Sequence, residues 1–133
     1  MRFVIPWSFC VSKRDKTDYY RGKPRRSEKW KAALRATNLL AASQRPPGMK
    51  AFEGPVDVQF RIVFPTRRQT DPHNYMEVIL DGLEGVAYLN DQQARTGGWC
   101  LVGYSKDEAR IEVIVSPVSP SILEQLQQEL NLQ

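Results

Sequence analysis

The chain has 133 residues, of which 41% are hydrophobic and 26% are charged, and its formal net charge is +4. This length predicts one domain, whose folding buries about two thirds of the surface of the unfolded chain. No apolar run approaches the roughly 20 residues of a membrane span and no signal-peptide pattern opens the chain, so the sequence predicts neither a membrane protein nor an exported one.

The charge is distributed unevenly along the chain. Residues 1–70 hold 16 Lys and Arg against 5 Asp and Glu, whereas residues 71–133 hold 3 against 10. Clustered basic charge favours a phosphate backbone, because neutralised phosphates release counterions. Clustered acidic charge favours divalent cations. The two halves together indicate a site where metal and phosphate meet, although the same pattern arises when opposite charges merely cancel across a folded surface.

The two cysteines, Cys10 and Cys100, are too few for a disulfide framework or a zinc cluster. Both have apolar neighbours in the sequence. We therefore expect two buried thiols in a protein of a reducing compartment.

The first half of the chain predicts a strand, a loop and a helix. Residues 2–7 form a short strand that ends at a proline and a tryptophan. Residues 8–26 lack periodicity and predict a long basic loop, of a length found at functional sites or in disordered segments. Ser27 is a predicted N-cap for a helix over residues 28–43. The residues expected on one face of that helix are Trp30, Ala33, Leu34, Thr37, Asn38 and Ala41.

The second half predicts three strands and two helices. Strict alternation of apolar residues predicts a half-buried strand over residues 56–64, and Thr70 or Asp71 is placed to cap the next helix. Residues 99–104 and 110–115 predict two antiparallel strands around a turn at 105–108. A helix is expected from Ser121, with a capping box and an apolar stripe. The stripe consists of Ile122, Leu123, Leu126 and Leu130.

These elements predict a single α+β domain over residues 1–133, with a mixed or antiparallel sheet packed against two main helices. Residues 1–116 form its core and residues 117–133 a helical tail. The tail either contributes to a contact between subunits or covers its own core, and the second role is the one we expect.

The helix that follows Asp71 carries the most informative motif. At 100° per residue, its polar residues fall within an arc of roughly 120° and its apolar residues occupy the opposite arc. The polar residues are Asp71, Asn74, Glu77 and Asp81, and the apolar ones are Met76, Ile79, Leu80 and Leu83. Asp91 follows in a short loop. Singly, these acids are also explained as a helix N-cap (Asp71), a solvated helix residue (Asp81) and a turn residue (Asp91).

Carboxylates in this pattern are suited to phosphodiester hydrolysis with a divalent ion. Mg²⁺ prefers oxygen ligands and keeps several waters, so two or three carboxylates suffice to hold it. A bound ion lowers the pKa of a water molecule and stabilises charge on the phosphoryl oxygens. The sequence therefore predicts Mg²⁺ as the cofactor, with Mn²⁺ as an alternative.

The pattern D-x-x-N-x(6)-D-x-L-x-G-V-A-Y-x-x-D, followed by two glutamines, resembles the signature of the RusA family of Holliday-junction resolvases. The opening strand with its proline and aromatic residue is similar as well, so the resemblance extends over residues 2–116. Its specific part is residues 71–93. The positions that match are Asp71, Asn74, Asp81, Leu83, Gly85, Tyr88, Asp91 and Gln93.

The resemblance implies a RusA-like fold and a homodimer that binds four-way DNA junctions and nicks two strands symmetrically, for recombination and repair. A cytoplasmic setting in a bacterium or a phage-infected cell is implied in the same way. Asp71, Asp91, Asn74 and Glu77 occupy the implied catalytic positions. The candidate metal ligands are Asp71 and Asp91, with Asp81 as an outer ligand and His73 as a further one.

The chain departs from the family pattern at three positions of the motif. His73 stands where the family usually has a second catalytic Asp, Glu77 where it has a Lys, and Asn90 where it has the first Asp of a pair. Either the site compensates, with Glu77 supplying the lost acid and His73 shifting the metal preference towards Mn²⁺ or Zn²⁺, or the site has lost activity.

Basic residues of both loops are the candidate DNA contacts. They are Lys13, Arg14, Lys16, Arg21, Lys23, Arg25, Arg26, Arg67 and Arg68. Tyr19, Tyr20 and Trp7 belong to the same candidate surface, and we expect an aromatic side chain among them to stack on an unpaired base at the branch point. Two alternatives remain: a branched-DNA-binding protein without catalysis, and an interaction module without nucleic acid. Only the second of these predicts binding that does not vary with salt.

Overall fold

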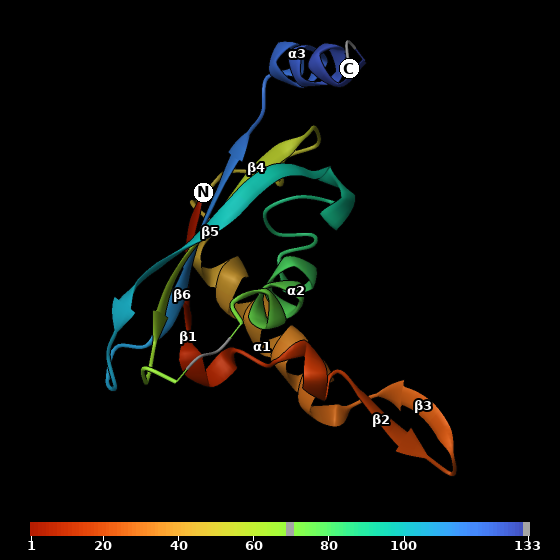
Figure 1. The fold of residues 1–133 in the computed structure, drawn as a ribbon, viewed down its shortest axis with the longest axis vertical. Coiled ribbons are helices and arrows are strands. Elements are labelled where there is room, and N and C mark those ends of the chain that lie inside the picture. The colour runs from red at the N-terminus through yellow and green to blue at the C-terminus, as the bar shows by residue number, and fades with distance from the viewer. Residues whose placement is uncertain (69–70, 132–133) are drawn as a thin grey trace.

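The computed structural model describes residues 1–68 and 71–131, and it confirms the α+β prediction. Its main sheet has four strands in the order β1-β6-β4-β5. Helices α1 and α2 lie on one side of this sheet (Figure 1). The bounds are β1 Arg2–Pro6, α1 Glu28–Gln44, β4 Val56–Phe64, α2 His73–Gly82, β5 Ala94–Tyr104 and β6 Arg110–Pro117.

Strand β4 occupies the middle of the sheet because every second side chain is large and apolar. It pairs antiparallel with β6 and parallel with β5. The alternating residues from Val56 to Phe64 are all buried against the helices. The strand was expected to be half-buried, and its opposite face is largely polar apart from the buried Val63.

The two last strands run antiparallel around a turn at residues 105–108, as predicted. They do not pair with each other, because β4 lies between them. Alternation of apolar residues predicts which side chains of a strand are buried. It does not predict which strands lie next to each other, because that depends on how the whole sheet assembles. Because β4 and β5 are parallel, a crossover connection must join them. Residues 65–93, with α2, form that connection.

Helix α1 begins at the predicted cap. The backbone N–H of Trp30 donates a 3.1 Å hydrogen bond to Ser27 Oγ, and the helix buries Trp30, Ala33, Thr37 and Ala41. The small residues among them allow α2 to approach closely. A Cβ atom added at Gly82 would lie 2.7 Å from Cγ2 of Thr37, so only glycine fits at this contact between α1 and α2.

Helix α2 turns its apolar side to the core as predicted. Ile79 and Leu83 are fully buried, and Met76 and Leu80 pack partly buried against the core. Val78, which was not assigned to the apolar arc, is also fully buried because α1 covers that side. Of the two predicted caps, Thr70 lies outside the described residues, and Asp71 is not the N-cap, because that position is taken by Pro72, which forms no side-chain cap bond.

The predicted basic loop is largely ordered structure. Two 3-10 helices, Trp7–Phe9 and Lys13–Asp15, lead into a hairpin of β2 (Thr17–Tyr20) and β3 (Lys23–Arg26). The hairpin turn has positive φ at Arg21 (52°) and Gly22 (77°), as two-residue hairpin turns require. The prediction missed this hairpin because its exposed strands lack apolar alternation. It projects away from the sheet and helices (Figure 1).

The C-terminal helix α3 (Pro120–Asn131) forms where expected but does not cover the core. It stands beyond the end of β6, away from the sheet (Figure 1). Its stripe residues Ile122, Leu126 and Leu130 are 50%, 44% and 71% exposed. The expected role as a cover for its own core is therefore wrong.

The cysteines differ from each other. Cys10 is partly buried, and burial raises the pKa of its thiol to about 12. Cys100 is exposed on the edge strand β5, so the expectation that both are buried is wrong for this residue. Among the described residues, no helix combines the length and the apolar character that crossing a membrane needs.

Candidate active site

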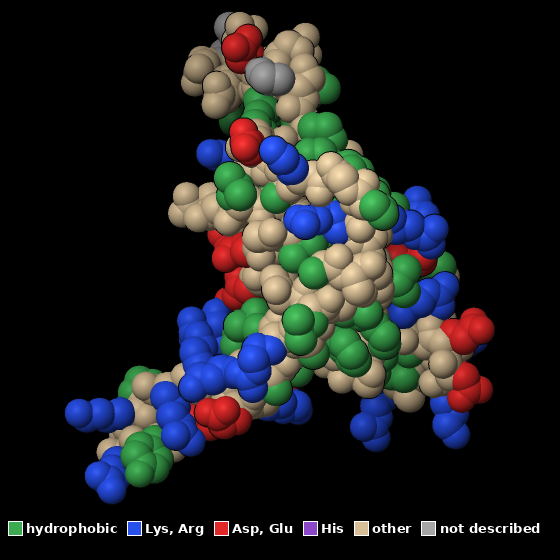
Figure 2. Space-filling model, turned by 180° about the vertical axis from the view of Figure 1, so that it is seen from behind, with side chains coloured by type: hydrophobic (Ala, Val, Ile, Leu, Met, Phe, Trp, Pro, Cys, Tyr) green, Lys and Arg blue, Asp and Glu red, His purple; other side chains and the backbone are tan. Residues whose placement is uncertain are grey.

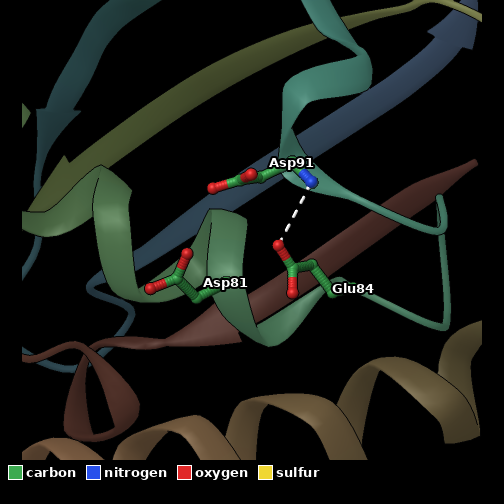
Figure 3. A group of neighbouring side chains, drawn as sticks. All are labelled: Asp81, Glu84 and Asp91. Carbon is green, nitrogen blue, oxygen red and sulfur yellow. Dashed lines mark hydrogen bonds between the residues drawn. The ribbon is translucent and has the colours of Figure 1, made fainter.

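Three carboxylates gather where α2 ends and the chain turns toward β5. Asp81 belongs to the last turn of α2, Glu84 follows the helix, and Asp91 begins the 3-10 helix Asp91–Gln93. One ligand atom from each lies within 4.8 Å of those of the other two, and the three side chains surround one small region (Figure 3). Carboxylate oxygens at this spacing suit a hard cation such as Mg²⁺ or Mn²⁺.

The loop that carries Asp91 is fixed by hydrogen bonds at both ends. Asn90 and Gln93 form a reciprocal capping box around the 3-10 helix. The Gln93 amide also donates 2.8 Å hydrogen bonds to the carbonyls of Phe52 and Gly54, in the segment before β4. Asp91 N–H donates to Glu84 Oε1 at 3.1 Å, so Glu84 links the two sides of the cluster.

The turn that carries Glu84 is held by helix α1. Asn38 Nδ2 donates to the carbonyls of Gly82 and Glu84, at 3.0 and 3.1 Å. The Tyr88 hydroxyl donates a 2.6 Å hydrogen bond to the Leu80 carbonyl. Burial raises the pKa of this tyrosine, and so do Asp91 and the other acids nearby. Tyr88 therefore remains a neutral hydrogen-bond donor beside the cluster.

The pKa of Asp81 is raised above its ordinary value. Partial burial is the largest cause, and the negative charges of Asp91, Glu84 and Glu77 act in the same direction. Lys16 opposes them by favouring the ionised form. The cluster thus carries unneutralised negative charge, which a divalent cation would relieve.

Lys16 meets the motif helix at Glu77. The ammonium group forms an ion pair with the Glu77 carboxylate and lies 5.2 Å from the centroid of the Trp30 ring. Its side chain is only 19% exposed. Glu77, one of the predicted catalytic residues, therefore binds the side chain of Lys16 and keeps it about one helical turn from Asp81.

Asp71 and His73 form a separate pair at the other end of α2. Asp71 Oδ1 accepts hydrogen bonds from the His73 backbone N–H at 3.0 Å and from the His73 ring Nδ1 at 2.9 Å. These bonds lower the pKa of Asp71. His73 Nε2 accepts a 3.3 Å hydrogen bond from the Trp99 indole, so both ring nitrogens are engaged.

The structure brings two of the four predicted metal ligands together. Ten residues at 1.5 Å rise separate Asp71 from Asp81 by roughly 15 Å, so Asp71 and His73 lie apart from the cluster of Asp81 and Asp91. Asn74 sits in the first turn of α2, where its N–H donates to the Asp71 carbonyl rather than the carboxylate. Which of these residues bind metal stays a prediction.

Glu84 was missed in the sequence. The sequence shows only that Glu84 lies three residues after Asp81, in a segment where the helical periodicity no longer holds. Two glycines flank it, and the direction of a side chain in such a turn cannot be read from periodicity.

The predicted DNA-contacting residues fall into two groups. Most of those of the N-terminal segment lie on the 3-10 helix at Lys13–Asp15 and on the projecting hairpin, where Lys and Arg side chains gather (Figure 2). Lys16 is the exception, because it lies between these two elements and is paired with Glu77, with only 19% of its side chain exposed. Arg21 and Arg25 lie over the Tyr20 ring, at 5.3 and 4.9 Å. Arg67 and Arg68 instead follow β4 and line a pocket beside Asp71.

The three aromatic residues predicted to contact DNA also separate. Tyr19 and Tyr20 are exposed on the hairpin, at 73% and 53%. Trp7 instead packs against Phe64 and Tyr75, with ring centroids 5.4 and 4.7 Å away, at the edge of the core.

Fold and site together define an α+β domain whose crossover connection carries a cluster of three carboxylates, in a chain that also has a basic projecting hairpin. The family model of endodeoxyribonuclease RusA matches residues 6–116 of this chain. The chain therefore belongs to the RusA family, whose members are Holliday-junction-resolving endonucleases that bind branched DNA and generally depend on divalent metal. This confirms the resemblance seen in the sequence. No curated protein matches the chain.

Proposed function

We propose that the protein is a metal-dependent, structure-specific endodeoxyribonuclease that resolves four-way DNA junctions by paired symmetric nicks. The observation that carries this proposal is the convergence of Asp81, Glu84 and Asp91 within 4.8 Å, in a chain of the RusA family. In this role the enzyme acts in recombination and repair of DNA in the cytoplasm of a bacterium or a phage-infected cell.

Asp81 and Asp91 would hold a Mg²⁺ or Mn²⁺ ion, with Glu84 as a third oxygen ligand or as the acceptor that positions Asp91. A divalent ion bound there supplies a water of lowered pKa and stabilises charge on the phosphoryl oxygens. Glu77 acts by holding Lys16 toward the phosphate. Asp71 and Asn74 act at the start of α2, where Asp71 orients His73 against the strand.

The DNA path follows from the charge of the surface. The basic hairpin and the preceding 3-10 helix would hold phosphates on one side of the acidic cluster, and Arg67 and Arg68 on another. Backbone contacts of this kind position a duplex without reading its sequence.

Paired nicks need two active sites, so we propose a homodimer. The exposed stripe of α3, with Ile122, Leu126 and Leu130, offers a surface for the second copy. Helix α3 lies outside the matched residues 6–116, in keeping with a nuclease core at 1–116 and an accessory tail at 117–133.

The test is cleavage of a labelled synthetic four-way junction with Mg²⁺, with Mn²⁺ and with EDTA. The variants are Asp81→Asn, Asp91→Asn and Asp71→Asn, and the matched control is Asp107→Asn in the exposed β5–β6 turn. We expect paired, metal-dependent nicks that the control retains. Loss of about 10²-fold or more in Asp91→Asn and Asp81→Asn would support a metal held at the cluster.

A second function has specific support. Glu77 neutralises Lys16, and His73 has both ring nitrogens occupied, which leaves fewer groups for catalysis than a carboxylate-rich centre would have. A branched-DNA-binding protein without cleavage would bind the junction tightly and salt-dependently, yet produce no nicks in either metal.

A further inference from the structure

A pocket of about 480 Å³ lies between the edge strand β5 and the segment that follows β4. Its lining combines aromatic rings, arginines and one carboxylate. The lining residues that matter here are Phe64, Arg67, Asp71, Trp99, Leu101 and Tyr104. None of the aromatic residues of β5 was predicted to contact DNA from the sequence.

The sheet register explains why these rings face the pocket. In the parallel pair, Trp99, Leu101 and Tyr104 lie beside Phe60, Ile62 and Phe64 of β4, and so share their face of the sheet. A bulge leaves Val102 without a register partner, which brings Tyr104 onto this face although it is three residues from Leu101.

Strand β5 carries this apolar face beyond the cover of the helices. Phe60 and Phe64 are 2% and 3% exposed, whereas Trp99, Leu101 and Tyr104 are 42%, 39% and 42% exposed. Three large apolar side chains in a row on an exposed face mark a binding surface rather than an uncovered core.

Charge identifies the kind of ligand. The Arg67 guanidinium lies 5.4 Å from the centroid of the Tyr104 ring, and Arg68 also lines the pocket. Aromatic rings beside arginines hold unpaired nucleobases, because a base stacks on the ring while its phosphate meets the cation. The hydrogen bond between Trp99 and His73 fixes the indole at one end of the pocket.

We propose that this pocket receives an unpaired nucleobase of the DNA strand, next to the branch point. The inference rests on the proposed function, since it requires a DNA substrate. It goes further by assigning the recognition of an extruded base to Trp99 and Tyr104, with Arg67 on the phosphate beside it.

The experiment measures binding in EDTA, where cleavage does not occur. The probes are a four-way junction with 2-aminopurine at the branch point, the same junction with 2-aminopurine inside an arm, and a matched linear duplex. The variants are Trp99→Ala, Trp99→Phe and Arg67→Gln. The control is Val102→Ala, at the 57% exposed residue of the bulge.

We expect the fluorescence at the branch point to change on binding, and the arm probe to stay constant. Trp99→Ala should remove that change and weaken junction affinity roughly tenfold, the order of one base–aromatic stack, with the duplex affinity unaltered. Trp99→Phe should keep both, because a phenyl ring still stacks. Arg67→Gln should weaken affinity while keeping the fluorescence change.

Equal affinities and signals for Trp99→Ala and Val102→Ala would overturn the proposal. A change of oligomeric state in Trp99→Ala would also overturn it, by showing that the pocket is a subunit contact. Thermal melting shows whether each variant is folded. Because the readout is binding, loss of base capture is distinguishable from failure of the proposed function, in which the wild-type protein produces no nicks.

Discussion

The ion pair between Lys16 and Glu77 brings a cation from the N-terminal segment to the acidic cluster. A lysine 19% exposed, held between a carboxylate and the Trp30 ring, has little freedom to leave that position. Its effect on the pKa of Asp81 shows that its charge reaches the cluster. The charges at positions 16 and 77 are therefore expected to act together.

Reversing the two charges tests this dependence. Lys16→Glu places another negative charge beside Asp81 and removes the positive one, so junction cleavage should fall roughly tenfold or more, by the size of Coulomb effects between partly buried charges. Junction cleavage by Glu77→Lys alone should also fall, because the ammonium groups of Lys16 and the new lysine repel each other. The double variant Lys16→Glu with Glu77→Lys should recover much of the activity. A double variant no better than the worse single one would contradict the role of the pair.

The raised pKa of Asp81 predicts a trade between stability and function. The folded protein binds this proton more tightly than the unfolded chain, so stability falls as pH rises through the window above the ordinary value of 3.8. The penalty is present at neutral pH and absent at pH 3. Asp81→Asn should therefore raise the melting temperature at pH 7, and not at pH 3.

Asp71→Asn is the opposite case and serves as the comparison. The pKa of Asp71 is lowered by its hydrogen bonds with His73, so its contribution to stability is present above the ordinary pKa and is lost as pH falls through the lowered one. Its replacement should lower the melting temperature at pH 7. If the melting temperatures of Asp81→Asn and Asp71→Asn changed with pH in the same way, the opposite pKa shifts of Asp81 and Asp71 would be contradicted.

Added Mn²⁺ should raise the melting temperature of the wild type and not that of Asp81→Asn, because an ion that binds only the folded protein stabilises it by mass action.

For individual residues, the sequence predicted part of the acidic cluster. Asp81 and Asp91 were among the predicted residues because their spacing and residue types are readable along the chain. Glu84 and Lys16 were not placed beside them, because one depends on the direction of a turn and the other on a contact across 61 residues.

The crossing of α1 and α2 determines where the cluster lies. Gly82 touches Thr37, and Asn38 binds the carbonyls on either side of Leu83, so the end of α2 is positioned by two consecutive residues of α1. Helix α1 was predicted closely from its cap and periodicity, and β4 and the apolar side of α2 from periodicity alone. The hairpin and the order of strands in the sheet were not predicted, because no local pattern of apolar residues in the sequence indicates either of them.

Gly82→Ala tests this contact. The added methyl group would lie 2.7 Å from Thr37 Cγ2, so the helices must separate, at a cost of about 1–3 kcal/mol in the free energy of unfolding. Gly103→Ala is the control, since nothing lies within 4 Å of the position that its added methyl group would take. Adding Thr37→Ser to Gly82→Ala should recover part of the loss. Denaturant unfolding measures each value, and equal stabilities of the two alanine variants would contradict close packing at Gly82.

At the scale of the whole molecule, the basic hairpin and the acidic cluster occupy different parts of the structure. The hairpin extends the basic surface beyond the body, while the carboxylates lie at the end of α2 (Figures 2 and 3). In the proposed function, the basic hairpin would hold the DNA backbone, and binding would then depend on counterion release.

The salt dependence of junction binding tests the role of the hairpin. Neutralising Lys23 and Arg26 together, as Lys23→Gln with Arg26→Gln, should make the slope of log K against log salt less negative by about 1.8, or 0.9 for each lost phosphate contact. Lys50→Gln is the control, because residue 50 follows the far end of α1. An unchanged slope in the double variant would place the DNA elsewhere.

The crossover from β4 to β5 has a consequence for how the site is assembled. The same connection that supplies all three carboxylates is the covalent link between two neighbouring strands of the sheet, and its last 3-10 helix runs directly into β5. Pairing of β5 with β4 and the approach of Asp91 to Asp81 therefore depend on the same connection. A cation held by the carboxylates would also restrain the fraying of β5, and with it the aromatic wall of the pocket, so metal binding and the proposed base binding would stabilise each other.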